Sequence, residues 1–242
     1  MDLPRRELLA GIGSASVIGT AGCLGGGGSD TGSNTDVGTP SGPSLSTALS
    51  QCTDTTVEPV SSLPSPTMGQ SEAAVSIEVF EDFACSHCQT FSTEVFPQIR
   101  EQFISEGVVS FQFRDFPIPV DPWSWYAASA ARSTQDIGGE ASFFKFTKKI
   151  YEQQSVLLDN GYQLIHDAAE AAGISGCTAA VAAETLAYQD VVRDDKQSGI
   201  ELEVPGTPAV FVNGTLLQDY RWETVKPRYH LAEEAHEPPA RG

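Results

Sequence analysis

The chain has 242 residues, enough to bury a full hydrophobic core, and 40% of them are hydrophobic. Thirty-two acidic residues against fourteen basic ones give a formal net charge of -18, which disfavours binding to nucleic acids or to anionic lipid headgroups. Only five of the basic residues are lysines, and this acid-rich balance resembles that of halophile proteins with acidic surfaces. The charge therefore indicates solubility more than the choice of a partner.

Residues 1–22 have the pattern of a twin-arginine export signal. Arg5-Arg6 precede an apolar run, Leu8–Gly22, which at about fifteen residues is too short for a spanning helix of roughly 20. Small residues then lead to Cys23, as in a lipoprotein cleavage box, and we expect Cys23 to be lipidated. A buried N-terminal helix is the weaker alternative, because this stretch is rich in glycine.

Residues 23–72, which begin at the lipidated cysteine, are predicted to form a flexible spacer. They contain a Gly- and Ser-rich run and scattered prolines, and they have no sustained apolar period. Leu45–Leu49 is expected to form at most a short helical turn that carries Cys52. Nothing in the spacer is predicted to contribute to a core.

Residues 73–238 are predicted to form one domain that begins with a βαβ unit. Alternating apolar residues predict a strand at Ala74–Phe80, and the next apolar residues recur at helical spacing from Ser86 to about Phe103, with a kink at Pro97. A second strand follows at Val109–Phe113. Strand, helix and strand in about forty residues indicate a parallel pair with a right-handed crossover.

A helical insertion is expected at about residues 120–200, in four segments of which the last runs from Thr178 to Gln197. Trp123 and Trp125 near its start are expected in the core rather than over a site. Asn213-Gly214 then predicts a tight hairpin. It joins strands at Ala209–Val212 and Thr215–Leu217, and a last helix covers Trp222–Ala235. The predicted class is α/β, with a mixed sheet and a helical insertion.

The Cys85-Ser86-His87-Cys88 motif falls where the first strand ends and the first helix begins. The free N–H groups and the positive end of the helix dipole favour a thiolate at Cys85, the expected nucleophile. Cys88, one turn further and directed inward, suits the resolving thiol. His87 is expected to add a donor, and a positive charge when protonated, beside the Cys85 sulfur.

Two other interpretations of this motif are weaker. A structural zinc site needs four ligands, and the other histidines form no second pair at the usual spacing, so no metal is expected. A purely structural disulfide would close a very small loop and give little stabilisation. Redox chemistry is therefore favoured.

Thr207-Pro208 precedes the third strand and is a second element of the site. A proline can enter a strand only at its first residue or at an edge. With Cys85 and Cys88 upstream and Asn213-Gly214 downstream, we expect a cis peptide bond here, against an ordinary trans turn.

The chain resembles the DsbA-like branch of the thioredoxin superfamily over about residues 73–236. Three stretches carry the resemblance, and they are Phe80–Cys88, Phe113–Pro117 and Gly206–Gly214. The resemblance implies a thioredoxin fold with an inserted helical subdomain and a thiol-disulfide oxidoreductase without a cofactor. It also implies that Cys85 attacks, that Cys88 resolves, and that Thr207 and Pro208 bind substrate as an added strand.

The chain departs from this branch at two positions. Ser86 stands where the branch commonly has proline, which makes the redox potential harder to predict. Val79 stands where many relatives place a buried acid that assists proton transfer. Glu78 and Glu81 flank it, and the sequence does not identify a proton-relay carboxylate.

Cys52 and Cys177 remain after Cys23 is assigned to lipid. An even pair in an oxidising compartment predicts a disulfide between them, and two unpaired thiols are the alternative.

Three functions remain open on the sequence. The first is a lipid-anchored oxidase on the extracytoplasmic face of the cell membrane, which introduces disulfides into exported proteins or peptides and is served by an unidentified membrane redox partner. The second is a reductase or isomerase on the same fold. The third is a lipoprotein that binds copper or a partner through Cys85, Cys88 and a histidine.

Overall fold

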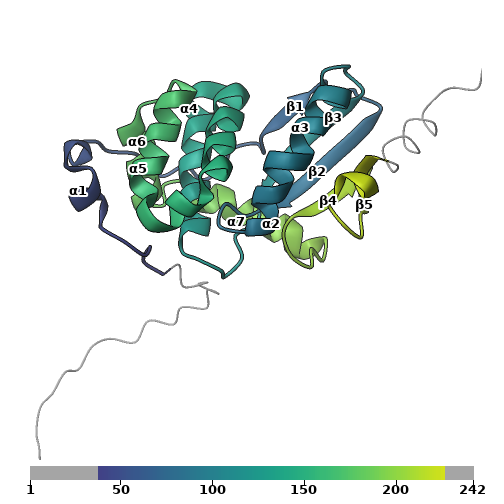
Figure 1. The fold of residues 1–242 in the computed structure, drawn as a ribbon. Helices are drawn as coiled ribbons and strands as arrows, with labels where there is room; N and C mark the ends of the chain where they lie inside the picture. Colours follow the sequence, from purple (N-terminus) through teal and green to yellow (C-terminus); the bar gives the residue numbers. More distant parts are fainter. Residues whose placement is uncertain (1–37, 227–242) are drawn as a thin grey trace, which may run out of the picture. The chain divides into compact units, whose positions relative to one another are not determined.

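The computed structural model describes residues 38–226. This part of the chain forms a five-stranded mixed sheet with a helical subdomain beside it, as Figure 1 shows. The predicted fold class, a mixed sheet with a helical insertion, is therefore confirmed. The export signal, Cys23 and residues 227–238 lie outside the described residues. None of the helices in residues 38–226 has the length and apolarity needed to cross a membrane.

The sheet has the strand order β1-β3-β2-β4-β5. β2 (Val75–Glu81) and β3 (Val109–Asp115) are parallel, which confirms the βαβ unit. β1 (Thr67–Gly69) pairs antiparallel with the outer edge of β3, and the sequence did not predict it. Three residues are too few to show a period, so β1 depends on the neighbouring strand.

A helical run connects β2 and β3. It consists of α2 (Ser86–Thr90) and α3 (Phe96–Ile99), each followed by a wider π-helical turn. Pro97 has no N–H to donate to the carbonyl one turn back. The turn before it is widened, and the N–H of Phe96 bonds to the carbonyl of Phe91. The helical run therefore accommodates Pro97 by widening the turn before it.

The two faces of the sheet have different neighbours. Val75, Ile77 and Val79 of β2 point into the main core, which extends into the helical subdomain. Phe80 points to the other face, where its ring contacts Phe116 and Phe211. Both faces of β2 are therefore covered near the end of the strand that leads to the cysteine motif.

The helical subdomain contains α4 (Trp123–Glu152), α5 (Gln154–Ala172) and α6 (Gly176–Glu184). α4 merges two predicted segments and bends at Gly139, whose φ of 73° favours glycine. The prediction of one long helix from Thr178 to Gln197 is wrong. Left-handed backbone at Leu186 ends α6, and α7 (Gln189–Glu201) begins separately and returns to the sheet.

A hairpin completes the sheet. β4 (Ala209–Val212) pairs with β2 and with β5 (Thr215–Leu216), and both turn residues, Asn213 and Gly214, have positive φ. The predicted Asn-Gly hairpin is confirmed. Residues 222–226 are helical, and the remainder of the predicted last helix lies outside the described residues.

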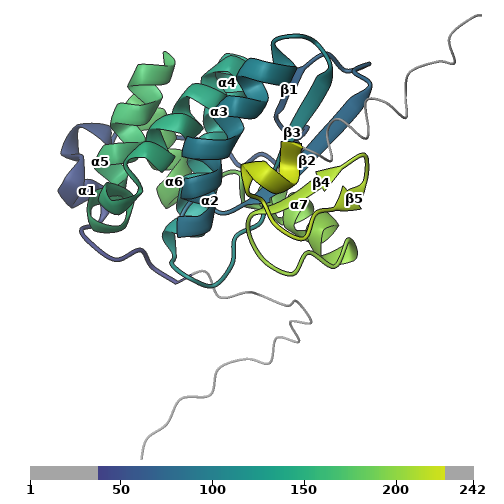
Figure 2. The same cartoon turned by 45° about the vertical axis from the view of Figure 1, so that its right-hand side comes forward.

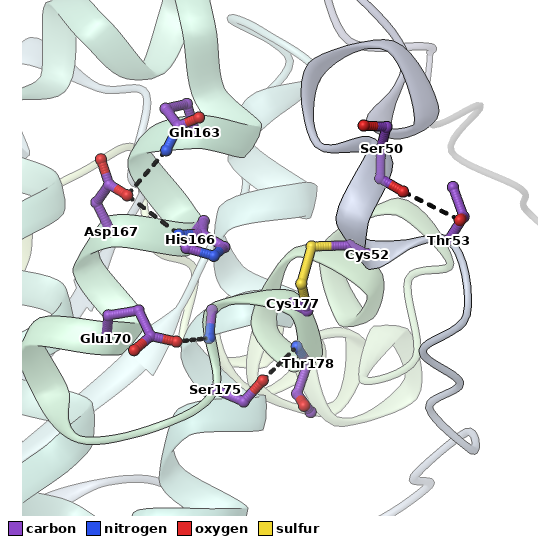
Figure 3. Close-up of a disulfide and its surroundings, with 11 residues drawn as sticks. Ser50, Cys52, Thr53, Gln163, His166, Asp167, Glu170, Ser175, Cys177 and Thr178 are labelled. Atoms are coloured by element: carbon purple, nitrogen blue, oxygen red, sulfur yellow. Dashed lines mark hydrogen bonds and ion pairs between the residues drawn. A yellow bond between two sulfur atoms is a disulfide. The ribbon is translucent and has the colours of Figure 1, made fainter.

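The described part of the predicted spacer, residues 38–72, is mostly exposed, but the prediction that none of it contributes to a core is wrong. In α1 (Leu45–Ala48) and the following turn, Leu45, Leu49 and Cys52 are at most 3% exposed and belong to the core. Cys52 forms a disulfide with Cys177 at the start of α6, as Figure 3 shows. Sparse apolar residues are buried here because a neighbouring subdomain and a cross-link hold them.

A buried charge cluster joins the helical subdomain to the sheet. The guanidinium of Arg132 on α4 is fully buried and contacts Asp115 of β3 at 2.6 Å and Asp195 of α7. Asp195 also accepts from Arg114 of β3 and from Ser65, both at 2.8 Å. Four segments of the chain therefore meet at one set of paired charges.

Replacing Arg132 by Met is expected to lower the free energy of unfolding by about 3–5 kcal/mol, because it leaves the buried carboxylate of Asp115 without a charged partner and removes one of the two arginines that pair with Asp195. Burial raises the pKa of Asp115 to about 6 even beside Arg132, so this carboxyl is ionised at neutral pH. Urea unfolding at pH 7.5 measures the loss. Arg193→Met is the control, since Arg193 is exposed and pairs with exposed Asp190. Equal, small effects of the two substitutions would contradict this role of Arg132.

Candidate functional site: a buried dithiol at the end of β2

Cys85 lies directly before α2 and caps its N-terminus. Its backbone is extended, with φ of -82° and ψ of 123°, so the chain turns into the helix at this residue. The backbone N–H groups of His87 and Cys88, at the start of the helix, help to lower the pKa of its thiol. Cys85 is 8% exposed, whereas Cys88 is fully buried, and both are free thiols in this structure.

The two thiols have opposite pKa shifts. The pKa of Cys85 is lowered to about 5, first by a hydrogen bond from the Cys88 thiol and then by Thr207 and the N–H groups of the helix start. Burial raises the pKa of Cys88 well above its usual value. At neutral pH the pair therefore holds one thiolate, on the more accessible sulfur.

The ring of His87 is turned toward a residue that the sequence did not indicate. His87 Nδ1 lies 2.9 Å from the Tyr220 hydroxyl, and the two rings are in contact. The leading contribution of His87 to the Cys85 thiolate comes from its backbone N–H. Tyr220 follows the hairpin, 133 positions from His87, and no local pattern relates the two.

A glutamine of the helical subdomain holds the loop before the motif. The side-chain amide of Gln154, at the start of α5, donates to the carbonyls of Phe83 and Cys85 at 2.8 and 2.9 Å. Within the loop, the carboxyl group of Asp82 accepts from the N–H groups of Ala84 and Ile118, both at 2.7 Å. The backbone around Cys85 is thus fixed from both sides.

Thr207 and Pro208 lie opposite the cysteines. The peptide bond between them is cis, as expected from the sequence. The Cys85 thiol lies 3.4 Å from the Thr207 carbonyl oxygen. The hydroxyl of Thr207 is buried beside this sulfur and helps to lower the pKa of Cys85.

Two buried carboxyl groups lie behind the cysteines. Burial raises the pKa of Glu81 to about 8, against a 2.7 Å hydrogen bond from Ser92 that stabilises its carboxylate. Burial likewise raises the pKa of Asp82 to about 7, and the backbone N–H of Asp82 donates to the Cys88 sulfur at 3.3 Å. Glu81 was noted in the sequence only as a flanking acid, and Asp82 was missed. Their position at the end of the predicted buried strand is the sequence feature that could have identified both acids.

The described residues contain one group of three side chains that could ligate a metal, namely Cys52, Cys177 and His166. The disulfide joins both sulfurs of this group, and the ring of His166 bonds to Asp167 (Figure 3). Cys85 and Cys88 do not belong to it. Trp123 and Trp125 lie in the core, as expected.

This arrangement exchanges thiols with disulfides. One thiolate is slightly exposed, a second thiol is fully buried beside it, and the carbonyl and hydroxyl groups of Thr207 face the first sulfur. Together with the βαβ and hairpin topology, the site defines a thiol-disulfide oxidoreductase of the thioredoxin fold.

The chain belongs to the thioredoxin family, because the thioredoxin family model matches residues 61–227. Disulfide bond formation protein D of Bacillus subtilis is 25% identical over 166 residues, which cover 64% of this chain and 70% of that protein. A probable disulfide bond formation protein D of Bacillus anthracis is 28% identical over 156 residues, which cover 62% and 70% of the two chains.

Solved structures agree on the fold. Oxidised BdbD of Bacillus subtilis superposes with a TM-score of 0.65 at 23% identity, covering 74% of this chain and 100% of that one. DsbA of Chlamydia trachomatis gives 0.63 at 19% identity, with 75% and 97% covered. The family and these relatives support the same activity, and the protein is a thiol-disulfide oxidoreductase.

Replacing Cys88 by Ala is expected to raise the pKa of Cys85, because it removes the largest stabilising contact of the thiolate. His87→Ala keeps the backbone N–H, so we expect it to shift that pKa by less than one unit, which is about 1.4 kcal/mol. The ultraviolet absorbance of the thiolate, followed against pH in the reduced protein, measures both. A larger rise in His87→Ala than in Cys88→Ala would show that the imidazole, not the neighbouring thiol, holds the thiolate.

Glu81→Gln is expected to stabilise the reduced protein at pH 7 by on the order of 3 kcal/mol and to have little effect at pH 4.5. The pKa of Glu81 rises on folding from 4.5 to about 8, so the unfolded chain loses this proton first. The wild-type protein therefore loses stability as the pH rises through this window, and the glutamine variant does not. Urea unfolding at the two pH values tests this, with Glu94→Gln, an exposed acid on the same helical run, as the control. A stabilisation independent of pH would contradict the raised pKa.

Proposed function

We propose that the protein acts as an oxidase, which passes the disulfide between Cys85 and Cys88 to substrate thiols. The observation that carries this proposal is the lowered pKa of Cys85. A stabilised thiolate favours the reduced form of the pair, and a pair that favours its reduced form is a stronger oxidant. The names of the Bacillus relatives, disulfide bond formation protein D, support the same direction.

In the proposed reaction a substrate thiolate attacks the Cys85 sulfur of the disulfide. This forms a mixed disulfide and releases Cys88, which takes up a proton. A second substrate thiolate then attacks the substrate sulfur of the mixed disulfide and releases Cys85 as a thiolate. The substrate is oxidised by two electrons and the protein pair is reduced by two.

Glu81 is the proposed source of the proton for Cys88. With a pKa of about 8, this carboxyl group is mostly protonated at pH 7, and its charge affects the buried Cys88 thiol. When the reduced pair is reoxidised, the reaction runs in the opposite direction. Cys85 then attacks an oxidant, and Cys88 resolves the mixed disulfide. Asp82, with a pKa of about 7, is the second group that can exchange a proton near this site.

Thr207 and Pro208 are proposed to bind the substrate as an added strand. The Thr207 carbonyl lies 3.4 Å from the Cys85 sulfur, so a substrate strand that pairs with the backbone here would lie beside the reacting sulfur. Backbone recognition of this kind suits an enzyme that acts on many protein thiols.

The substrates are proposed to be exported proteins, and the protein is proposed to be held by lipid on Cys23 at the extracytoplasmic face of the membrane. The Arg5-Arg6 signal and the small residues before Cys23 support this location. An oxidising compartment also suits the disulfide between Cys52 and Cys177. A membrane redox partner would reoxidise the reduced pair.

The oxidised protein is expected to convert a reduced, unfolded two-cysteine protein to its disulfide form with one disulfide transferred per molecule. Quenching with acid and counting free thiols over time measures the transfer. Cys85→Ser should be inactive, and Cys88→Ser should accumulate a mixed disulfide when mixed with an oxidised substrate. An equilibrium that leaves the substrate reduced and the protein oxidised would assign the protein to the reductase class.

The lipid anchor predicts that the mature protein fractionates with membranes and that Cys23→Ser releases it or blocks its processing. One acyl chain binds only marginally, and the acidic protein cannot add attraction to anionic headgroups, so two chains are expected. Mass spectrometry of the N-terminal peptide and a high-salt wash of the membranes test this. Mature Cys23→Ser protein that still sediments after the wash would place the anchor elsewhere.

A further inference from the structure

A cavity of about 340 Å³ lies between the helical run after β2 and the second half of α4, away from the cysteine motif. Figures 1 and 2 both show α3 beside α4 in this region. The apolar walls of the cavity include Met68, Phe96, Pro97 and Phe144. The rings of Phe96 and Phe144 stack with their centroids 5.9 Å apart. The volume is at the lower end of the range for small-molecule sites.

The charge around this cavity is opposite to that of the chain. Arg100, Lys145 and Lys148 line it with a single carboxylate, Glu152, in a protein whose net charge is -18. Lys148 is paired with Glu152, and Arg100 lies 3.8 Å from exposed Glu101. Lys145 has no ion pair within the described part of the chain. An apolar cavity with an uncommitted cation suits an anion with an apolar body.

One buried polar atom in the wall also lacks a partner. Thr147 is 6% exposed, and its hydroxyl has no hydrogen bond within residues 38–226. The other wall hydroxyls are used, since Ser92 donates to Glu81 and Thr93 donates to the carbonyl of Gln89. Buried hydroxyl groups are normally paired, so Thr147 adds an unsatisfied polar atom to this wall of the cavity.

We propose that this cavity binds a medium-chain fatty carboxylate, with its chain against the apolar wall that Phe96 and Phe144 form and its carboxylate at Lys145. The apolar walls exclude a nucleotide or a sugar phosphate as the natural occupant, and the small volume excludes a whole phospholipid. The single unpaired cation suits a monoanion better than a multiply charged group. The cavity does not include Cys85 or Cys88, and the proposal does not rest on the oxidase assignment.

The proposal is tested by titrating the purified protein with decanoate in a calorimeter, below the concentration at which decanoate aggregates. Saturable binding of one decanoate per chain is expected. Lys145→Glu should weaken it at least tenfold, and Lys149→Glu, which makes the same charge change on the same helix outside the cavity, should not. Decanol, which has no charge, should bind at least tenfold more weakly than decanoate.

A second variant guards against a folding effect. Ala141 is an exposed residue of the cavity wall, and Ala141→Leu should block the cavity while leaving unfolding in urea unchanged. Absence of saturable binding would overturn the proposal, and so would equal affinities of the Lys145→Glu and Lys149→Glu proteins. Equal binding of decanol and decanoate would also overturn it, because the cation would then play no part.

Discussion

The placement of the helical subdomain on the sheet depends on the ion pairs of the fully buried Arg132 guanidinium. It pairs with Asp115 at the end of β3 and with Asp195 of α7, so the insertion is fixed on the sheet where β3 ends. From the same subdomain, Gln154 then reaches the carbonyls of the loop before α2. The backbone geometry at Cys85 is thus set partly by a helix 69 positions away. A buried ion pair adds little net stability, but a buried charge that is left without its partner is strongly destabilising.

The burial of two acidic side chains at the site destabilises the folded protein. Glu81 and Asp82 are buried, and their raised pKa values mean that folding is weakened as the pH rises toward 8. The same burial keeps a proton available next to Cys88 at neutral pH. A protein with apolar side chains at this end of β2 would be more stable, but its buried Cys88 thiol would lack the proposed proton donor. The loss of stability accompanies the proposed chemistry.

Local chemistry made part of the structure predictable from the sequence. Cys85 and Cys88 at a strand-to-helix junction, and Asn213-Gly214 between apolar runs, each follow from a few neighbouring residues, and both lie where expected. The contacts that were missed join distant segments. The partner of His87 is Tyr220, 133 positions away, and the burial of Leu45 depends on helices far along the chain. The disulfide between Cys52 and Cys177 was predicted from the number of cysteines, but composition cannot show that the segment around Cys52 packs against the helical subdomain.

If the surroundings of Cys85 make the pair oxidising, the reduction potential of the Cys85–Cys88 pair must be high, and this potential is the decisive measurement. The protein is equilibrated with glutathione buffers at pH 7, and the fraction reduced is measured by alkylation and mass spectrometry. We expect a potential closer to the about -120 mV of DsbA than to the about -270 mV of thioredoxin. A potential at or below that of thioredoxin would contradict it.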